Sequence, residues 1–151
     1  MEYHNPVLLK ETVDGLNIKP GGVYVDVTFG GGGHSAEILR RLGPDGKLFA
    51  FDQDEDALAN ALPDERFTLI NENFRFIKRF LRFYGVKGVD GILADLGVSS
   101  HQFDVAERGF STRFDAGLDM RMSQKNDLSA YRVVNEYDDA NLRRVFFDYG
   151  E

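Results

Sequence analysis

Three acidic residues and a run of four glycines are the residues best suited to ligand chemistry in this 151-residue chain. Asp26, Asp52 and Asp95 each end a short apolar run, and the run Gly30 to Gly33 follows the first of them. Carboxylates accept hydrogen bonds from hydroxyls and attract cations. Glycines allow positive φ angles and let a ligand approach the main chain closely. Together these residues predict a binding site for a nucleotide-like ligand.

The elements that must position these residues alternate between strands and helices. Apolar, β-branched and aromatic runs predict four strands, at residues 23–27, 47–52, 67–70 and 89–95. Helical spacing predicts helices before and between them, within residues 6–18 and at 35–42, 54–62 and 75–83. Such βαβ units form a parallel α/β sheet, whose ligands lie beyond the carboxyl ends of the strands. The acids and the glycines are therefore expected to meet at one edge of this sheet.

Each strand end offers a group that a nucleoside needs. Asp52 stands 22 residues after Gly30 and can accept hydrogen bonds from both ribose hydroxyls. Phe74 follows the third strand and can pack on an adenine face. Asp95 stands where a substrate must meet the cofactor.

Asp26 distinguishes between two classes of nucleotide. A carboxylate at that position suits the cationic end of S-adenosylmethionine, directly or through water, and repels a diphosphate. The glycine run also satisfies a dinucleotide-binding pattern, so a nicotinamide-dependent oxidoreductase (NAD) is the rival interpretation. Asp26 favours a methyltransferase.

Composition and charge limit the other functions that the protein could have. The net charge of −7 weighs against nucleic-acid binding by bulk charge, although a local basic face remains compatible with it. No cysteine occurs and the three histidines lack ligand spacing, so we expect no metal site. No apolar stretch reaches the length of a membrane span and no signal peptide is evident, which predicts a cytoplasmic protein that binds no membrane.

The hydrophobic periodicity of the sequence is lost after the fourth predicted strand. Residues 97–122 show no period, and a loop of that length in a compact domain is usually functional. Helical spacing returns at residues 129–149. The positions expected to be buried there are Tyr131, Val134, Leu142, Val145 and Phe146.

Six blocks, in order along the chain, resemble the bacterial small-subunit ribosomal RNA cytosine-N4 methyltransferases, the RsmH or MraW family. They are His4-Asn-Pro-Val-Leu-Leu9, Asp26-Val-Thr-Phe-Gly-Gly-Gly-Gly-His-Ser35, Phe51-Asp-Gln-Asp54, Gly91-Ile-Leu-Ala-Asp-Leu-Gly-Val-Ser-Ser100, Glu107-Arg-Gly-Phe-Ser111 and Leu118-Asp-Met-Arg-Met122. The resemblance covers almost the whole chain and is far more specific than a glycine pattern.

This resemblance implies a class I methyltransferase with a Rossmann-like sheet. Its cofactor would be S-adenosylmethionine and its product a cytidine methylated at N4 in the decoding region of 16S ribosomal RNA. It implies the assembled small ribosomal subunit as partner, and a homodimer stays open. The cofactor contacts that it implies are Gly32, Gly33, His34, Asp52, Phe74, Asp95 and Gln102, to which the charge argument adds Asp26.

Family members are about twice as long, with a helical domain inserted after the fourth strand. The chain is therefore expected to be an N-terminal fragment. It would hold the first half of the methyltransferase domain in residues 1–104, and a long loop with the start of the helical insertion in residues 105–151. A cofactor-binding fragment without turnover is accordingly a second alternative. The family reads Asp-Gly-Pro-Leu where residues 115–118 here are Asp-Ala-Gly-Leu.

Methyl transfer to cytosine N4 needs the amine to be aligned, because its lone pair is delocalised into the ring. Asp95 is the catalytic candidate: we expect it to fix the cofactor and to orient the amine. The hydroxyls of Ser99 and Ser100 should border the same place.

Two groups of basic residues are candidates for contact with RNA. The helical run at 75–84 is expected to bury one face and to leave Lys78, Arg79 and Arg82 merely solvated. The loop arginines are either RNA contacts or ion-pair partners within an acidic loop; they are Arg108, Arg113 and Arg121.

Overall fold

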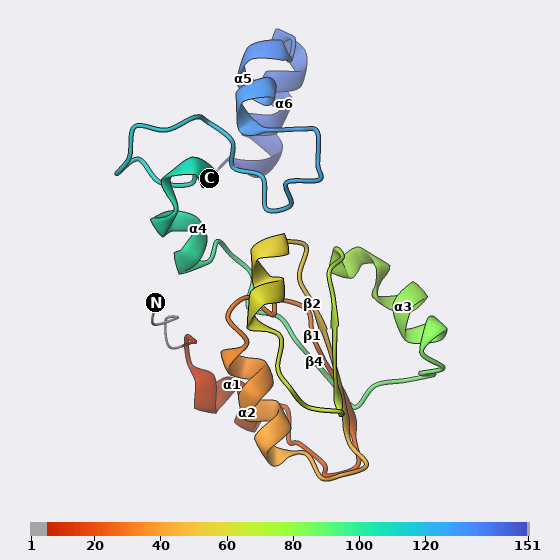
Figure 1. The fold of residues 1–151 in the computed structure, drawn as a ribbon. Coiled ribbons are helices and arrows are strands. Elements are labelled where there is room, and N and C mark those ends of the chain that lie inside the picture. Colours follow the sequence, from red (N-terminus) through yellow and green to blue (C-terminus); the bar gives the residue numbers. More distant parts are fainter. Residues whose placement is uncertain (1–5, 151) are drawn as a thin grey trace. The chain divides into compact units, whose positions relative to one another are not determined.

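Four parallel strands form the centre of the first part of the chain in the computed structural model, which describes residues 6–150 (Figure 1). They are β1 (Val23–Asp26), β2 (Lys47–Phe51), β3 (Phe67–Ile70) and β4 (Gly91–Leu93). Their order in the sheet is β3-β2-β1-β4, and every pairing is parallel. The predicted α/β sheet is confirmed, with each strand within two residues of its predicted bounds.

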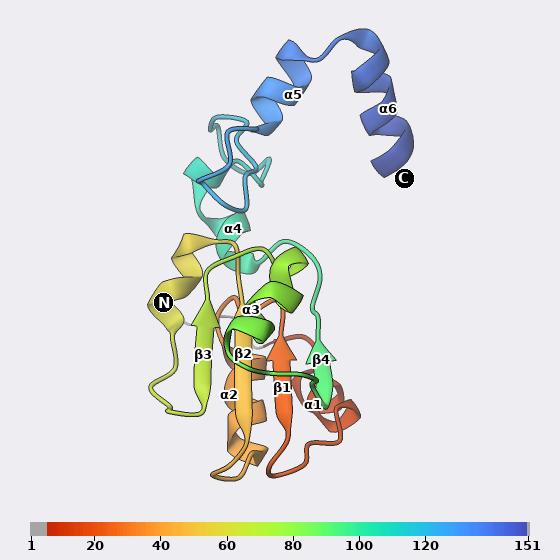
Figure 2. The ribbon, with the colours of Figure 1, turned by 90° about the vertical axis from the view of Figure 1, so that its right-hand side faces the viewer.

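Helices cover both faces of this sheet. Helices α1 (Leu9–Gly15) and α2 (Gly33–Arg41) lie on one face, and α3 (Ile77–Phe83) lies on the other (Figure 2). Side chains alternate accordingly: Tyr24 and Leu48 are buried with α1 and α2, whereas Val25, Phe49 and Phe51 are buried against α3. Because both faces are packed, the strand ends are held rigidly where a ligand would bind.

Two connections differ in detail from the prediction. The helix expected at 54–62 is the 3₁₀ helix η1 (Glu55–Asn60), whose first turn is capped by the Asp54 carboxylate accepting from the Asp56 N–H at 3.1 Å. The helix expected at 75–83 begins as a 3₁₀ turn, η2 (Phe74–Phe76), and continues as α3. Local capping by Asp54 and Asn73 explains both tight starts.

The chain divides between Gly97 and Val98 into two compact units. None of the helices among the described residues is long and apolar enough to cross a bilayer. The second unit contains four described helical elements. These elements are α4 (Ser100–Asp104), η3 (Ala106–Arg108), α5 (Ala130–Glu136) and α6 (Asp139–Tyr149). The division precedes the boundary predicted after residue 104, and that domain assignment stays a prediction.

The second unit overturns two expectations. Residues 97–122 are not a loop throughout, because they contain α4 and η3. The burial expected at 129–149 is wrong for Tyr131, Val134 and Phe146, which are all exposed. The reason is that none of the three core clusters among residues 6–150 includes a residue of α5 or α6. Leu142 and Val145 are half-buried.

Candidate cofactor site

The glycine turn joins β1 to α2 by a backbone that only glycine adopts without strain. Gly30 and Gly32 have φ angles of +51° and +78°. The turn closes with the Gly32 N–H donating to the Phe29 carbonyl at 2.8 Å. A Cβ on Gly32 would also stand 2.9 Å from the Phe29 ring. The predicted strand, turn and helix are therefore present. Gly31 is exposed, whereas the Phe29 ring lies against Gly32 and the Pro6 ring lies against Gly33.

Asp52 at the end of β2 is tied to this turn. Its Oδ2 accepts from the Gly30 N–H at 2.7 Å, and its Oδ1 accepts from the Asp54 N–H at 2.9 Å. Asn60 holds the other side of the turn by donating to the Gly30 carbonyl at 3.0 Å. Asp52 is half-buried, so its side chain is not sealed from solvent. Its contact with ligand hydroxyls stays a prediction.

Asp26 at the end of β1 is fully buried. Its Oδ2 accepts from the Ser35 hydroxyl at 2.8 Å, and its Oδ1 accepts from the Thr28 N–H at 3.0 Å. Burial raises the pKa of this carboxyl, against the lowering effect of these hydrogen bonds. Asp26 thus holds the turn and the start of α2 from inside. Its contact with the cationic end of a ligand stays a prediction, and the side chain presents no exposed oxygen for it.

Thr28 links the end of β1 to the end of β4. The Asp95 N–H donates to the Thr28 hydroxyl at 2.8 Å, and this hydroxyl in turn lies 3.4 Å from Asp26 Oδ1. The Asp95 side chain is exposed. Within residues 6–150 its carboxylate makes no hydrogen bond or ion pair. The backbone of Asp95 is therefore fixed while its carboxylate remains available for a ligand or a substrate.

Phe74 follows β3 and is held beside the end of β2. The preceding Asn73 accepts from the Arg75 N–H at 2.9 Å and donates to the Gln53 side chain at 2.7 Å. The Phe74 ring is 40% exposed. An aromatic face that stays in solvent at a strand end is suited to stacking on a base.

His34 faces the amino-terminal segment of the chain. Its ring is buried, and Nε2 lies 3.3 Å from the Val7 carbonyl, to which it donates in the Nε2–H tautomer. A Cβ on the neighbouring Gly33 would overlap the Pro6 ring. The family resemblance implies the cofactor as the partner of His34, and helix capping is the alternative; the contact with this segment was missed, because nothing in the local pattern indicates it. Cofactor contacts of Gly33 and His34 stay predictions.

The first unit thus brings six of the eight predicted residues of the site to adjacent strand ends or to the turn between them, and His34 stands one residue further into α2. The profile of the MraW methylase family matches residues 1–151. The chain belongs to this family. Its class I methyltransferase fold follows, and the four-stranded parallel sheet is consistent with a Rossmann-like methyltransferase.

Curated MraW relatives are similar over the whole chain. This chain is 89% identical over 151 residues to "Ribosomal RNA small subunit methyltransferase H" of Flavobacterium johnsoniae. It is 73% identical over 151 residues to the protein of that name from Christiangramia forsetii. Each alignment covers 100% of this chain and 50% of the relative. A solved rRNA methylase from Streptococcus thermophilus is 26% identical with a TM-score of 0.42, covering 54% of this chain and 51% of that one. The chain thus spans about half the length of the curated relatives it matches.

Gln102, which the MraW resemblance implies as a cofactor contact, belongs to the second unit. Its N–H donates to the Ser99 hydroxyl at 3.2 Å, and its side-chain oxygen accepts from the Ser99 N–H at 3.1 Å. This reciprocal capping box starts α4. The Ser-x-x-Gln spacing is the signal that predicts α4 and that sequence reasoning missed. The cofactor contact of Gln102 stays a prediction.

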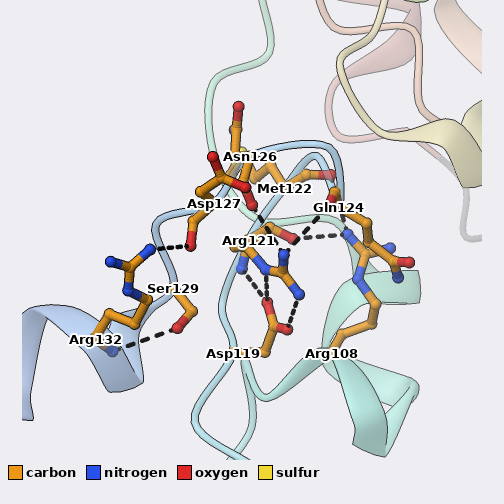
Figure 3. Close-up of polar contacts among 9 residues, drawn as sticks. All are labelled: Arg108, Asp119, Arg121, Met122, Gln124, Asn126, Asp127, Ser129 and Arg132. Atoms are coloured by element: carbon orange, nitrogen blue, oxygen red, sulfur yellow. Dashed lines mark hydrogen bonds and ion pairs between the residues drawn. The ribbon is translucent and has the colours of Figure 1, made fainter.

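Figure 3 shows that Arg108 and Arg121, two of the three loop arginines of this MraW family member, are held by groups of the protein itself. Arg108 is buried and donates to the carbonyls of Arg121 and Met122 at 3.0 and 3.1 Å. Arg121 pairs with Asp119 at 2.7 Å, which lowers the pKa of that carboxyl. Arg113 pairs with Asp104 at 2.7 Å. Arg113 and Arg121 thus form ion pairs, as one of the two interpretations expected, whereas Arg108 is held by backbone carbonyls.

Proposed function

We propose that this chain binds S-adenosylmethionine at the carboxyl ends of β1 to β4, and that the protein to which it belongs methylates N4 of a cytidine in small-subunit ribosomal RNA. One observation carries the proposal: the Asp52 carboxylate is hydrogen-bonded to a turn built on left-handed glycines. A ribose-binding group is thereby held beside an open main chain. The names of the curated relatives support the substrate class.

The residues present fit this cofactor. A carboxylate accepts hydrogen bonds from ribose hydroxyls, which is the role we assign to the half-buried Asp52, and the exposed Phe74 ring offers a face for the adenine. The glycine turn leaves its main chain accessible to the methionine part at Gly30 and Gly31, since a Cβ on Gly30 would meet no atom and Gly31 is exposed. Asp95 supplies an unpaired carboxylate at the next strand end. When bound, S-adenosylmethionine supplies an electrophilic methyl group attached to a positively charged sulfur.

Asp95 is the residue that we assign to the substrate amine. Its carboxylate accepts an N–H of the cytosine amine and so aligns the nitrogen lone pair. This interaction strengthens as positive charge develops on nitrogen during transfer. The hydrogen bond from the Asp95 N–H to Thr28 fixes the position from which the carboxylate acts. The target cytidine must be unstacked to reach it.

The cofactor assignment is tested by isothermal titration of this chain with S-adenosylhomocysteine. We expect binding by the natural chain, no heat with NAD, and affinity lower by roughly 10- to 100-fold in Asp52→Asn, the range for losing a charged hydrogen-bond acceptor. Glu65→Gln is the control, because Glu65 is exposed and remote from the glycine turn in sequence. Binding of NAD in place of S-adenosylhomocysteine would refute the proposal.

The substrate assignment is tested by methyl transfer to small ribosomal subunits and to naked 16S RNA, with a full-length relative as the enzyme. We expect label on N4 of one cytidine, with subunits preferred over naked RNA, as nucleoside mass spectrometry will show. The present chain, assayed beside the relative, should bind cofactor with little or no turnover. A methyl group on any other atom excludes the N4 assignment.

A further inference from the structure

One segment of this acidic protein is uniformly basic. Residues 73–89 contain five lysines and arginines and no acid, whereas the whole chain has a net charge of −7. All five cations are exposed. Four of them stand three or four residues apart, so they line one face of η2 and α3. We call these five residues together with Phe83 the α3 patch; the cations are Arg75, Lys78, Arg79, Arg82 and Lys87.

The fold does not use these cations. Elsewhere among the described residues, arginines such as Arg41, Arg66 and Arg121 are held in short ion pairs. Within the same described part of the chain, the last four cations of the α3 patch make no ion pair and no side-chain hydrogen bond. The first, Arg75, only stacks on the Phe76 ring, 4.6 Å from its centroid. Their charge is therefore fully available to a partner.

An exposed aromatic ring lies at the end of this basic face. Phe83 is 81% exposed and meets Tyr84 edge-on, with ring centroids 5.2 Å apart. Tyr84 in turn lies 5.3 Å from the buried ring of Phe49. The Phe83 ring is thus anchored to the core through Tyr84 while its own surface stays in water. Cations along a face with an exposed ring beside them are the groups that bind single-stranded nucleic acid.

The α3 patch begins near the proposed cofactor site. Its first cation directly follows Phe74, and α3 lies over the sheet beside the carboxyl ends of β1 and β2 (Figure 2). Both features belong to the first unit. A strand of RNA held on this helix would therefore run toward the place where the methyl group is presented.

We infer that the α3 patch binds a single-stranded segment of the RNA substrate, its cations contacting phosphates and Phe83 stacking on an unpaired base. The inference deepens the proposed function and rests on it. From sequence alone the loop arginines are the better RNA candidates and this helix a solvated face. The structure reverses that order, because the loop arginines are engaged in the protein whereas the helix cations are free.

The test measures the affinity of this chain for a fluorescein-labelled single-stranded RNA of about 12 nucleotides, by anisotropy at several salt concentrations. In Arg79→Gln/Arg82→Gln we expect affinity about tenfold lower near 0.1 M salt, and a log–log salt slope smaller by about 1.4, since each single-strand phosphate contact contributes about 0.7. The control Lys10→Gln/Arg143→Gln removes the same charge from exposed residues outside the patch. It should bind RNA like the natural chain.

A second pair of variants tests the aromatic part of the patch. Phe83→Ala should weaken RNA binding at least about fivefold at unchanged salt slope. Phe147→Ala, which removes a ring 88% exposed on α6, should not. Equal losses in the patch variants and their controls overturn the inference. So does binding of the natural chain to phosphatidylserine vesicles, sensitive to the patch, without any effect on RNA.

Titration with S-adenosylhomocysteine separates this result from the proposed function. Patch variants that bind this compound normally and RNA poorly support both. If the patch variants bind RNA like the natural chain, the inference about the α3 patch is wrong and the proposed cofactor site is unaffected. Failure of the natural chain to bind the compound removes the proposed function, whatever the RNA result.

Discussion

The buried carboxylate of Asp26 gives the sharpest prediction about what holds the cofactor site together. In Asp26→Ala, the Ser35 hydroxyl and the Thr28 N–H lose their acceptor inside the protein. A buried donor without a partner costs about 1–3 kcal/mol, so the loss of the acceptor for two donors should lower the free energy of unfolding by about 2–6 kcal/mol. In Asp26→Asn one oxygen still accepts from Thr28, and the Ser35 hydroxyl can reverse to accept. That variant should lose about 1 kcal/mol or less at weakly acidic pH.

The pH dependence of Asp26→Asn follows from the pKa of the natural residue. Burial raises the pKa of Asp26 above its ordinary value of 3.8, so the native state keeps this proton to higher pH than the unfolded state does. Its contribution to stability is therefore present below the ordinary carboxyl pKa and is lost as the pH rises through the raised native pKa. Asparagine has no such proton. Stability of the natural chain should accordingly decline relative to Asp26→Asn as the pH rises.

Urea unfolding followed by circular dichroism, at about pH 5 and about pH 7.5, measures both effects. Titration with S-adenosylhomocysteine then separates a scaffold role from ligand contact. A scaffold role predicts nearly unchanged affinity in Asp26→Asn. Our reasoning is refuted if asparagine is as destabilising as alanine, or if natural chain and asparagine variant share one pH dependence. A large loss of affinity in a stable Asp26→Asn would instead restore direct contact with the cationic ligand.

Two further predictions concern the edges of the structure. Gly33→Ala should lower the free energy of unfolding by about 1–3 kcal/mol, because its Cβ overlaps Pro6. The control Gly21→Ala meets no atom and should leave the stability unchanged. Urea unfolding measures both variants, and equal effects would contradict the packing of Pro6 on Gly33. Asp119→Asn breaks an ion pair whose partners are about one quarter exposed, so hydrogen exchange of residues 118–131 should speed up several-fold at pH 7 for a loss of about 1 kcal/mol. Since the pKa of Asp119 is lowered, its stabilising effect is lost as the pH falls through that value, and below it natural chain and variant should exchange alike.

The strands and the glycine turn were predictable because their signals are local. β-branched and aromatic runs ended by glycine or aspartate predict the sheet, and β3 was placed at residues 67–70 as observed. Asp52 was predictable as well, since its spacing from Gly30 follows from one βαβ unit. These features depend on neighbours in sequence, or on a single crossover.

The features that were not predicted from the sequence depend on helix capping or on contacts between residues far apart in the chain. The capping box of Ser99 and Gln102 starts a helix in a segment expected to be irregular, and that motif was readable from the sequence. The Asp138 side chain accepts from the Asn141 N–H at 2.8 Å and begins α6, which divides the helical region expected at 129–149. The partner of His34 was not predictable, because Val7 is 27 residues away. Ion pairing of the loop arginines likewise requires knowing which carboxylates the fold brings near.

The packing of Pro6 and Val7 on Gly33 and His34 has a practical consequence for expressing the protein. A purification tag or a cleavage scar at the amino end is joined close in sequence to this segment, which packs on the glycine turn of the proposed cofactor site. Such fusions should alter measured cofactor affinity more than fusions at the carboxyl end. Weak cofactor binding by a protein tagged at its amino end should therefore be measured again with the tag at the carboxyl end.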